Sequence, residues 1–506
     1  MNNVGKLLLA YHASTNHTPE SVQSNRHLLD WANHPLAFKI YTSLEKISLP
    51  RAFKASEGSA LDAIAGSGST SAREPVGLGI ETIGRLCYFS NGVTRVLRRR
   101  GAGVGEGMPF RAAACTGALY HIELYLICGD LADLEAGVYH YAAHDNALRQ
   151  LRRGDYRRVL VEATGAEPSV VEAPVILAAT STYWRNAWKY QARAYRHTFW
   201  DTGTILANLF AVAHANAIPC TLVLGFADEQ VNCLLDVDAN REAAVCLVSL
   251  GRGSPEAPTA PQLLPLNLPT QPLSAEQINY PAVIEAHAAS SFASGAAAAA
   301  WRHPSHAASR PDKALPEGEA NLGESIEAVI LRRGSSRRFA RDPISAVQLS
   351  DMLEVATRSI PTDLPGSGPL TEPYLIVNAV EGLAHGTYVF NRASRCLELL
   401  EKGEFRERAA FLDLGQDLGG EAAVDVYWLS DLNVALTRLG SRGYRAAQLE
   451  AAIEGGKLYL AAYALGLGAT GLTFFDDDVT RFFSPHAAGK SVMFLDAIGH
   501  PARRAS

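Results

Sequence analysis

The chain has 506 residues, of which 47 % are apolar, enough to build the cores of two to four domains. Its net charge of −6 excludes nucleic acid as the main partner, because neutralising phosphates requires a basic face. The seven cysteines show no CxxC or metal-ligand spacing, and no segment approaches the roughly 20 apolar residues of a membrane helix. We therefore expect a soluble cytoplasmic protein with no metal site and no membrane segment.

The first half of the chain is predicted to contain several short strands and one long helix. Short apolar runs bounded by turn residues predict the strands. Apolar residues recur at helical spacing from Tyr195 to Ala217, and Pro219 ends that helix. In chain order, the main expected strands are 124–128, 138–141, 148–151, 175–179 and 220–225.

Residues 252 to about 320 interrupt this pattern with Pro, Ala and Ser, which is typical of a surface linker that is partly helical near 275–291. The pattern then recurs, with a helix over 449–465 that is capped by Gly466-Leu-Gly468. We predict an N-terminal domain (1–251), a linker (252–320) and a C-terminal domain (321–506). Helices around a mainly antiparallel sheet make each domain α+β.

The two domains are predicted to be copies of each other. Glu123–Arg157 aligns without a gap on Glu372–Arg406, at a constant offset of 249 residues. At the same offset Arg193–Arg196 meets Arg442–Arg445. Chance rarely keeps one register over about seventy positions, and the unit is far longer than a solenoid repeat. Each copy should therefore be a whole domain.

The segment Arg332–Phe339 reads RRGSSRRF and is the strongest candidate site. Guanidinium groups, hydroxyls and free backbone N–H groups around a Gly-Ser-Ser turn suit a phosphate monoester. Taken alone, a solvated basic turn explains it equally well. Its position before an amphipathic helix at the start of a repeated domain favours the phosphate site. At the fixed offset Arg333 meets Gly84, in a segment without an Arg-Ser cluster.

Two further segments are candidates in the N-terminal copy. Ala112–Glu123 places small residues before a strand, where backbone can approach a flat ligand closely. In Trp184–Arg196, Lys189 and Tyr190 are adjacent, and a buried Lys with cationic neighbours can become a base with Tyr as its partner. A tight loop and a solvated basic helix start are the respective alternatives. The second copy has Arg438 and Leu439 in place of the Lys-Tyr pair.

Two weaker patterns are interpreted without a function. Gly101–Gly107 resembles a dinucleotide fingerprint, but no strand precedes it, so we expect a loop. The histidines His12, His17, His27 and His34 lack metal-ligand spacing.

Together these residues resemble the nitroreductase-like flavoprotein superfamily, and most closely the SagB/ThcOx-type dehydrogenases. Those enzymes oxidise thiazolines and oxazolines to azoles in peptide natural-product pathways. The most specific stretch is Lys189–Arg196 (KYQARAYR). The other family-like segments are Tyr11–Thr18, Thr116–Leu126, Gly137–Tyr141 and Arg333–Arg337, which together span nearly the whole chain apart from the linker.

The resemblance implies FMN at a dimer interface, with Lys189 and Tyr190 as the catalytic base and its assistant, in either order. The family's Arg-x-Ser-x-Arg turn holds the phosphate, and a basic residue after the final Gly-His-Pro turn, here Arg503 or Arg504, completes it. A small-residue loop lines the isoalloxazine. The implied phosphate residues are Arg333, Gly334, Ser335, Arg337 and Arg503, and the implied loop is Ala114, Cys115, Thr116, Gly117, Ala118 and Leu119.

The chain departs from the family in two ways. Family loops usually carry Ser where this chain has Ala114-Cys115, so one flavin contact is either lost or supplied by Thr116. Family members also usually have one domain, whereas two copies here could form the dimer within one chain. The phosphate turn is present only in the C-terminal copy, and the loop and Lys-Tyr pair only in the N-terminal copy. We therefore expect an intramolecular pseudo-dimer with one FMN per chain.

The expected activity is an FMN-dependent two-electron oxidation of an azoline-type or amino-acid-derived substrate, peptide-bound or carrier-bound, in peptide natural-product biosynthesis. Molecular oxygen is the expected electron acceptor, and biosynthetic partner proteins are expected. The pseudo-dimer would act as a monomer or pair with a second copy. An NAD(P)H-dependent nitro or quinone reductase and a non-catalytic substrate-binding scaffold are the alternatives.

Overall fold

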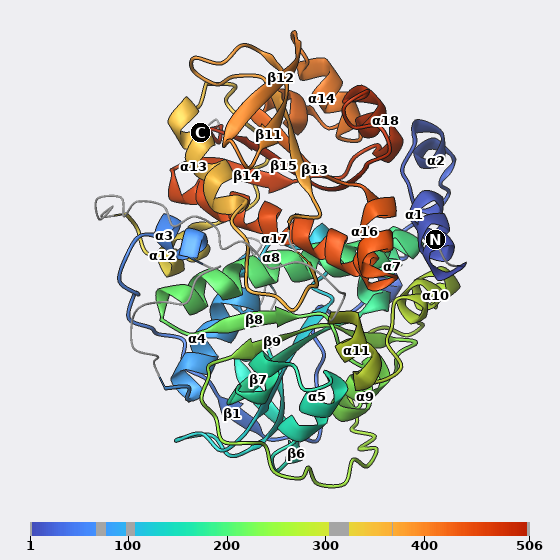
Figure 1. Cartoon of the computed structure of the whole chain (residues 1–506), viewed down its shortest axis with the longest axis vertical. Helices are drawn as coiled ribbons and strands as arrows, with labels where there is room; N and C mark the ends of the chain where they lie inside the picture. Colours follow the sequence, from blue (N-terminus) through green and yellow to red (C-terminus); the bar gives the residue numbers. More distant parts are fainter. Residues whose placement is uncertain (1–2, 67–76, 98–106, 303–322, 367, 503–506) are drawn as a thin grey trace.

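The computed structural model describes residues 3–66, 77–97, 107–302, 323–366 and 368–502. It stacks the two copies on opposite sides of a central layer of helices (Figure 1). The sheet of the N-terminal copy has the order β1-β6-β5-β4-β7-β9-β8, and that of the C-terminal copy β12-β11-β10-β13-β15-β14. Apart from the extra edge strand β1, the two orders correspond strand for strand. The duplicated α+β fold predicted from the sequence is confirmed.

All strand pairs within the two sheets are antiparallel. The N-terminal sheet contains β1 (Lys46–Ser48), β4 (Ile122–Cys128), β5 (Gly137–Ala142), β6 (Ala147–Arg153), β7 (Val175–Thr182), β8 (Cys220–Val223) and β9 (Glu242–Leu250). The C-terminal sheet contains β10 (Glu372–Val377), β11 (Gly386–Asn391), β12 (Cys396–Lys402), β13 (Val424–Ser430), β14 (Gly468–Gly471) and β15 (Ser491–Gly499). β2 (Val93–Leu97) and β3 (Met108–Arg111) pair antiparallel in a separate two-stranded sheet.

The helices also repeat between the copies. Those of the N-terminal copy are α1 (Asn3–Ser14), α2 (Pro19–Ser24), α3 (Ala60–Ala65), α4 (Ile80–Asn91), α5 (Arg157–Ala163), α6 (Pro168–Val171), α7 (Tyr183–Tyr190), α8 (Ala194–Ala215) and α9 (Asp228–Leu235). α10 (Pro281–Ala289) and α11 (Gly295–Arg302) follow. The C-terminal copy has α12 (Ile326–Arg332), α13 (Ala346–Ala356), α14 (Arg406–Leu412), α15 (Asp417–Glu421), α16 (Leu432–Leu439), α17 (Arg442–Ala464) and α18 (Asp476–Phe482).

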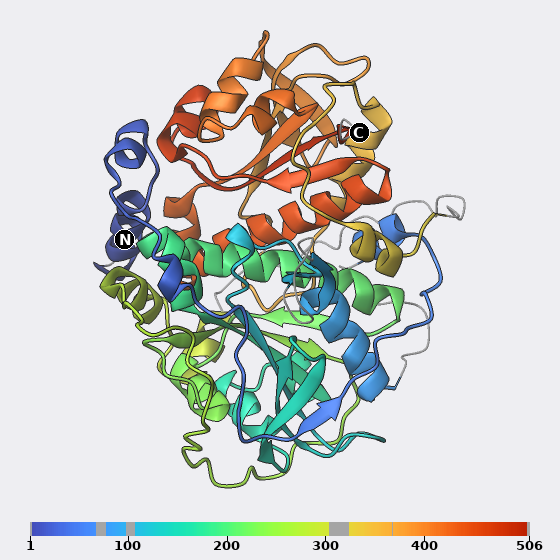
Figure 2. The same cartoon turned by 180° about the vertical axis from the view of Figure 1, so that it is seen from behind.

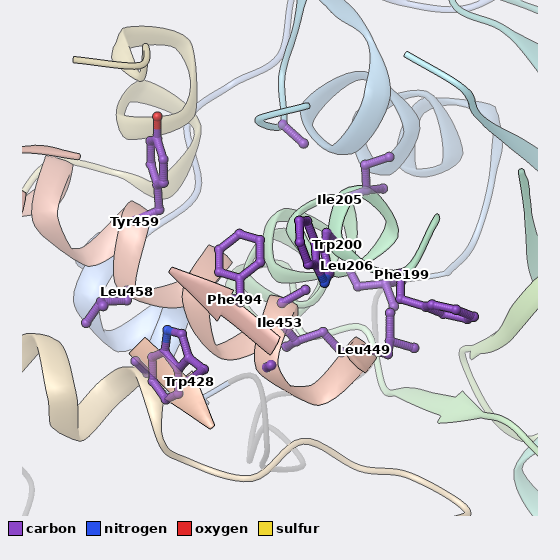
Figure 3. Packing of buried hydrophobic residues seen from close by; sticks show 14 of the residues in the cluster. Phe199, Trp200, Ile205, Leu206, Trp428, Leu449, Ile453, Leu458, Tyr459 and Phe494 are labelled. Atoms are coloured by element: carbon purple, nitrogen blue, oxygen red, sulfur yellow. The ribbon is translucent and has the colours of Figure 1, made fainter. Parts of the chain in front are cut away.

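Helices α8 and α17 join the two copies and are buried almost along their whole length. A Cβ added at Gly203 would lie 2.4 Å from the Cβ of Ala452, and one at Gly456 would lie 2.7 Å from the Cβ of Ala207. The small residues therefore let the two helices cross closely. Larger side chains, among them Trp200 on α8 and Leu449 and Ile453 on α17, pack on either side of this crossing (Figure 3).

Each copy fixes the other through a buried ion cluster. In the first, Arg193 and Arg196 at the start of α8 pair with Asp476 at the start of α18, with N···O distances of 2.9 and 2.5 Å. Burial raises the pKa of Asp476, but the two guanidinium groups outweigh burial and hold that pKa at about 2. The carboxylate is therefore ionised in the folded protein.

The second cluster repeats the first with the copies exchanged. Arg442 and Arg445 at the start of α17 pair with Asp228 at the start of α9, at 2.6 and 2.7 Å. Between the clusters the rings of Tyr195 and Tyr444, equivalent residues of the two copies, lie parallel with centroids 6.5 Å apart. Contact between equivalent residues is the signature of a two-fold axis, so the interface is that of a dimer formed within one chain.

Segments outside the repeat cover the junction of the two copies. In Figure 2, α1 and α2 lie beside the central helices, and the backbone N–H of His17 donates to Asp476 Oδ2 at 2.7 Å. α3 packs against both α8 and α17. Residues 252–302, within the expected linker, run over the N-terminal copy and contain α10 and α11. Among the described helices, none combines the length and apolar character needed to cross a membrane.

Candidate composite site between the two copies

The basic turn of the C-terminal copy reaches the small-residue loop of the N-terminal copy. Helix α12 ends at Arg332, and the Arg333 side chain extends across the junction. Arg333 Nε donates to the carbonyl oxygen of Ala112 at 2.9 Å, and Nη2 donates to that of Arg111 at 3.3 Å. The guanidinium also lies 5.5 Å from the ring centroid of Tyr459 on α17. We call this junction the first seam.

The turn after Arg333 is hydrogen-bonded to Tyr459 and Ala469, and it keeps side-chain donors that could bind a ligand. Tyr459 Oη lies 2.8 Å from Ser335 Oγ and donates to Gly334 O at 2.9 Å, and the Ser336 N–H donates to Ala469 O. Ser336 Oγ is buried with no hydrogen-bond partner among the described residues, and the Arg337 side chain is exposed. A Cβ at Gly468 would lie 2.3 Å from that hydroxyl oxygen, so only glycine leaves room for it. An unpartnered buried hydroxyl beside two arginines fits a bound phosphate.

The loop that faces this turn has an unusual backbone. Gly117, Ala118 and Tyr120 all have positive φ, near 65°, 55° and 49°. Such angles are unfavourable for residues with a Cβ and persist only where the surroundings hold them. The holding group is Asp201 on α8, which accepts hydrogen bonds from the Thr116 N–H at 2.9 Å and the Thr116 hydroxyl at 2.7 Å.

Asp201 also binds the residue before Thr116. The Cys115 thiol donates to Asp201 Oδ2 at 3.0 Å. Burial, with the charge and hydrogen bond of Asp201 adding to it, raises the pKa of Cys115 well above its ordinary value, so this residue is a thiol. The loop thus offers backbone groups and small side chains to a ligand.

The Lys-Tyr pair lies at the end of α7, beside the same loop. Tyr190 is half-buried, and a Cβ at Gly117 would lie 2.8 Å from its Oη. Burial, with Asp201 and Cys115 adding to it, raises the pKa of Tyr190, so its phenol stays protonated. Lys189 is exposed, with Nζ 5.2 Å from the Tyr190 ring centroid. The burial that the sequence argument assumed for this lysine is absent.

The structure brings most of the expected site residues to the first seam. Arg333 of the turn at 333–337 bonds to the backbone of Arg111 and Ala112, which leads into the loop at 114–119, and the Tyr190 hydroxyl lies against Gly117 of that loop. Arg503 lies outside the described residues. Sequence reasoning missed Ser336, because the family pattern selected its neighbour Ser335. It also missed Asp201. The signal that could have found it is the acidic residue Glu450, which stands at the fixed offset of 249 in the second copy.

The equivalent junction on the other side of the two-fold axis, which we call the second seam, is closed by side chains of the protein. The Asp363 carboxylate accepts from the N–H groups of Leu224 and Gly225 at 2.7 and 2.9 Å, and Arg302 pairs with it at 2.7 Å. Arg438, at the position equivalent to Lys189, donates to the carbonyl oxygens of Pro365 and Gly368. In the N-terminal copy, the position equivalent to Arg333 is Gly84, inside α4. Among the described residues, no cluster of His, Cys, Asp and Glu could hold a metal ion.

Comparisons with known proteins agree with this architecture. The family model described as the Nitroreductase family matches residues 101–252 and 330–485. A crystal structure from Anabaena variabilis, assigned as a nitroreductase, is 25% identical with a TM-score of 0.73, and the match covers 98% of this chain and 99% of that one. A Methanocaldococcus jannaschii protein named as a nitroreductase is 23% identical over 150 residues, 30% of this chain and 74% of its own length.

One match with a lower score comes from a biosynthetic assembly. A chain of the E. coli microcin synthetase McbBCD complex with truncated pro-MccB17 bound is 20% identical, covering 50% of this chain and 94% of that one. Its TM-score of 0.30 is too low to carry weight. The family model, by contrast, matches one segment in each copy and more than half of the chain. The chain therefore belongs to the nitroreductase family, a family of oxidoreductases, and carries its fold twice.

Proposed function

We propose that this protein is an FMN-dependent oxidase or dehydrogenase with one composite site per chain, located at the first seam. The observation that carries the proposal is the contact of Arg333 with the backbone of Ala112. Through it, a turn suited to a phosphate meets a loop suited to a flat ring, although the two lie in different copies. Family members typically bind a flavin, and the flavin FMN carries both a phosphate and a flat ring system.

The residues of the first seam divide between the two ends of such a cofactor. Arg333, Ser335, Ser336 and Arg337 would hold the phosphate by charge-assisted hydrogen bonds, with Arg503 as a further candidate. The loop from Ala114 to Leu119 would lie along the ring system. Bound FMN supplies the capacity to accept two electrons as a hydride.

Lys189 and Tyr190 would handle the proton that leaves the substrate. The raised pKa of Tyr190, caused first by burial, keeps the phenol protonated and favours a role as hydrogen-bond donor. Lys189, exposed at the end of α7, is the other ionisable member of the pair. We therefore assign proton removal to Lys189 and its assistance to Tyr190.

The closed second seam supports a single site. Asp363 and Arg302 occupy the backbone groups of Leu224 and Gly225 in that seam. Opening the seam would leave a buried aspartate without its partners, which is costly. One FMN per chain is therefore proposed.

The proposed substrate is an azoline-type or amino-acid-derived ring on a peptide or carrier, and molecular oxygen would reoxidise the cofactor. The resemblance of Lys189–Arg196 to the SagB/ThcOx-type dehydrogenases supports this substrate class. Incubation of purified protein with a thiazoline-containing peptide in air should remove two hydrogens from each ring, detected by mass spectrometry. Unchanged peptide mass with flavin-loaded protein would refute the proposed substrate.

A second candidate is an NAD(P)H-dependent nitro or quinone reductase, favoured by the match over nearly the whole chain to a protein assigned as a nitroreductase. Anaerobic addition of NADPH separates the two candidates. Rapid loss of flavin colour would support the reductase, whereas colour that persists until an azoline substrate is added would support the oxidase or dehydrogenase.

A further inference from the structure

Asp201 is a buried carboxylate beneath the candidate site, and its side chain is the centre of a hydrogen-bond network. Besides the hydrogen bonds from Thr116 and Cys115, it accepts one from His121 Nε2 at 2.9 Å. The other ring nitrogen of His121 lies 2.9 Å from Ser181 Oγ. The network ties the loop both to α8 and to the end of β7, which are rigid parts of the core.

The hydrogen bonds to Asp201 hold the loop next to the residues whose backbone angles are least favourable. Gly117, Ala118 and Tyr120 have positive φ, which two of these residues adopt only under constraint. The Thr116 N–H and hydroxyl, immediately before Gly117, are both occupied by Asp201 Oδ1. Thr204 on α8 adds a bond from its hydroxyl to Ala114 O at 2.8 Å. Removing the carboxylate would take away both bonds that hold Thr116, while the bonds from Thr204 to Ala114 O and from Arg185 to Tyr120 O would still hold the two ends of the loop.

Tyr190 rests on the part of the loop that Asp201 holds. Its Oη occupies the space that a side chain at Gly117 would fill. The closeness of the two groups also shows in the electrostatics, because after burial the charge of Asp201 is the main cause that raises the pKa of Tyr190. A displacement of Thr116 and Gly117 would therefore displace the phenol.

A carboxylate at this point of the central helix is common to both copies. Glu450 on α17, at the offset of 249 from Asp201, accepts from the N–H groups of Leu370 and Thr371 at 2.6 and 3.1 Å. In the second seam, however, Leu439 stands in place of Tyr190. The same support therefore serves a site only in the first seam, which makes Glu450 a natural control.

We propose that Asp201 is a positioning residue, which fixes the loop at 115–120 so that the Tyr190 phenol is seated on Gly117 at the flavin site. This role rests on the proposed function, but the seating itself is a property of the chain without cofactor. Asp201 acts through Thr116 and touches neither the reacting atoms nor the phosphate turn.

The test compares Asp201→Ala, Asp201→Asn and Glu450→Ala in the FMN-free full-length chain. Hydrogen exchange of the peptide that contains Thr116 should accelerate by about tenfold or more in Asp201→Ala, because its amide loses its acceptor. Nitration of Tyr190 by tetranitromethane, quantified by peptide mass, should accelerate in the same variant. Asp201→Asn keeps one oxygen for Thr116 and should fall between it and wild type, and Glu450→Ala should match wild type at both positions.

A second measurement links the seating to the cofactor. With FMN bound, Tyr190→Phe should change the visible circular dichroism of the flavin in wild type and change it little in Asp201→Ala. FMN should stay bound in both backgrounds, since the phosphate turn is intact. Unchanged exchange and nitration in Asp201→Ala, or equal effects of Tyr190→Phe in both backgrounds, would overturn the positioning role. Failure to bind FMN at all would instead refute the proposed function and leave the exchange and nitration results to decide the seating.

Discussion

Arg333 Nε, in the C-terminal copy, donates a 2.9 Å hydrogen bond to the carbonyl oxygen of Ala112 in the N-terminal copy. The contact places a basic turn and a small-residue loop at one junction, although they are more than two hundred residues apart in sequence. Because the equivalent junction is closed by Asp363 and Arg302, the duplicated chain keeps one candidate site.

Removing the basic turn should release the cofactor. Charge-assisted hydrogen bonds contribute about 1.5–3 kcal/mol each, so Arg333→Ala combined with Arg337→Ala should weaken FMN binding by about two orders of magnitude or more. The dissociation constant can be measured by quenching of flavin fluorescence. The control is Arg338→Ala, whose exposed side chain lies 3.9 Å from Glu421. Equal affinity in the double variant and the control would contradict the assignment.

The seat of Tyr190 should tolerate only glycine. In Gly117→Ala the new Cβ would lie 2.8 Å from Tyr190 Oη and would stand on a residue with φ near 65°. We expect FMN to remain bound while substrate oxidation falls by about tenfold or more, because the general acid–base pair is displaced. Gly382→Ala has a similar φ of 77° with no atom within 4 Å of the new Cβ. It controls for backbone strain alone and should oxidise substrate at the wild-type rate.

Acid should loosen the junction of the copies through the first ion cluster. The pKa of Asp476 is raised by burial but lowered further by Arg193 and Arg196, to about 2, against an ordinary value of 3.8. The folded pKa lies below the unfolded one, so the cluster stabilises the fold above about pH 4 and loses that contribution as pH falls towards 2. Urea unfolding should show a steeper fall of the unfolding free energy over this interval in wild type than in Asp476→Asn. Parallel curves would show that this carboxylate does not titrate as stated.

The opposite pH dependence is expected from two buried aspartates in the C-terminal copy. Burial raises the pKa of Asp413, and burial together with Asp413 raises that of Asp425. The folded state therefore holds protons that the unfolded chain releases, and stability falls as pH rises from about 4 through the raised folded pKa. Asp413→Asn keeps an oxygen for the Tyr427 hydroxyl and should gain stability relative to wild type between about pH 5 and 8. Asp417→Asn, at an exposed carboxylate, should show no such gain.

The repeat predicted the fold well because it compares the chain with itself. The arginine pairs of Arg193–Arg196 and Arg442–Arg445 recur for a structural reason, which the ion clusters now identify. Their partners, Asp228 and Asp476, could not be paired with them from sequence, since each contact joins different copies. Helix α17 begins at Arg442, seven residues before the predicted start at Leu449, because its polar first turns are buried against the other copy and carry no apolar periodicity.

The candidate site was less accessible to sequence reasoning. The sequence leaves open whether Lys189 is a buried base or part of a solvated basic helix, and its side chain is exposed at the end of α7. The roles of Ser336 and Asp201 depend on which side chains meet across the junction. The plug formed by Asp363 and Arg302 depends on the same geometry, so sequence divergence alone predicted a missing second site without its cause.

The most direct test of the composite site is the flavin stoichiometry of the purified full-length protein. After saturation with FMN and removal of the free cofactor, absorbance of released flavin against protein concentration should give one FMN per chain. Two FMN per chain would contradict the closed second seam, and none would contradict the site itself.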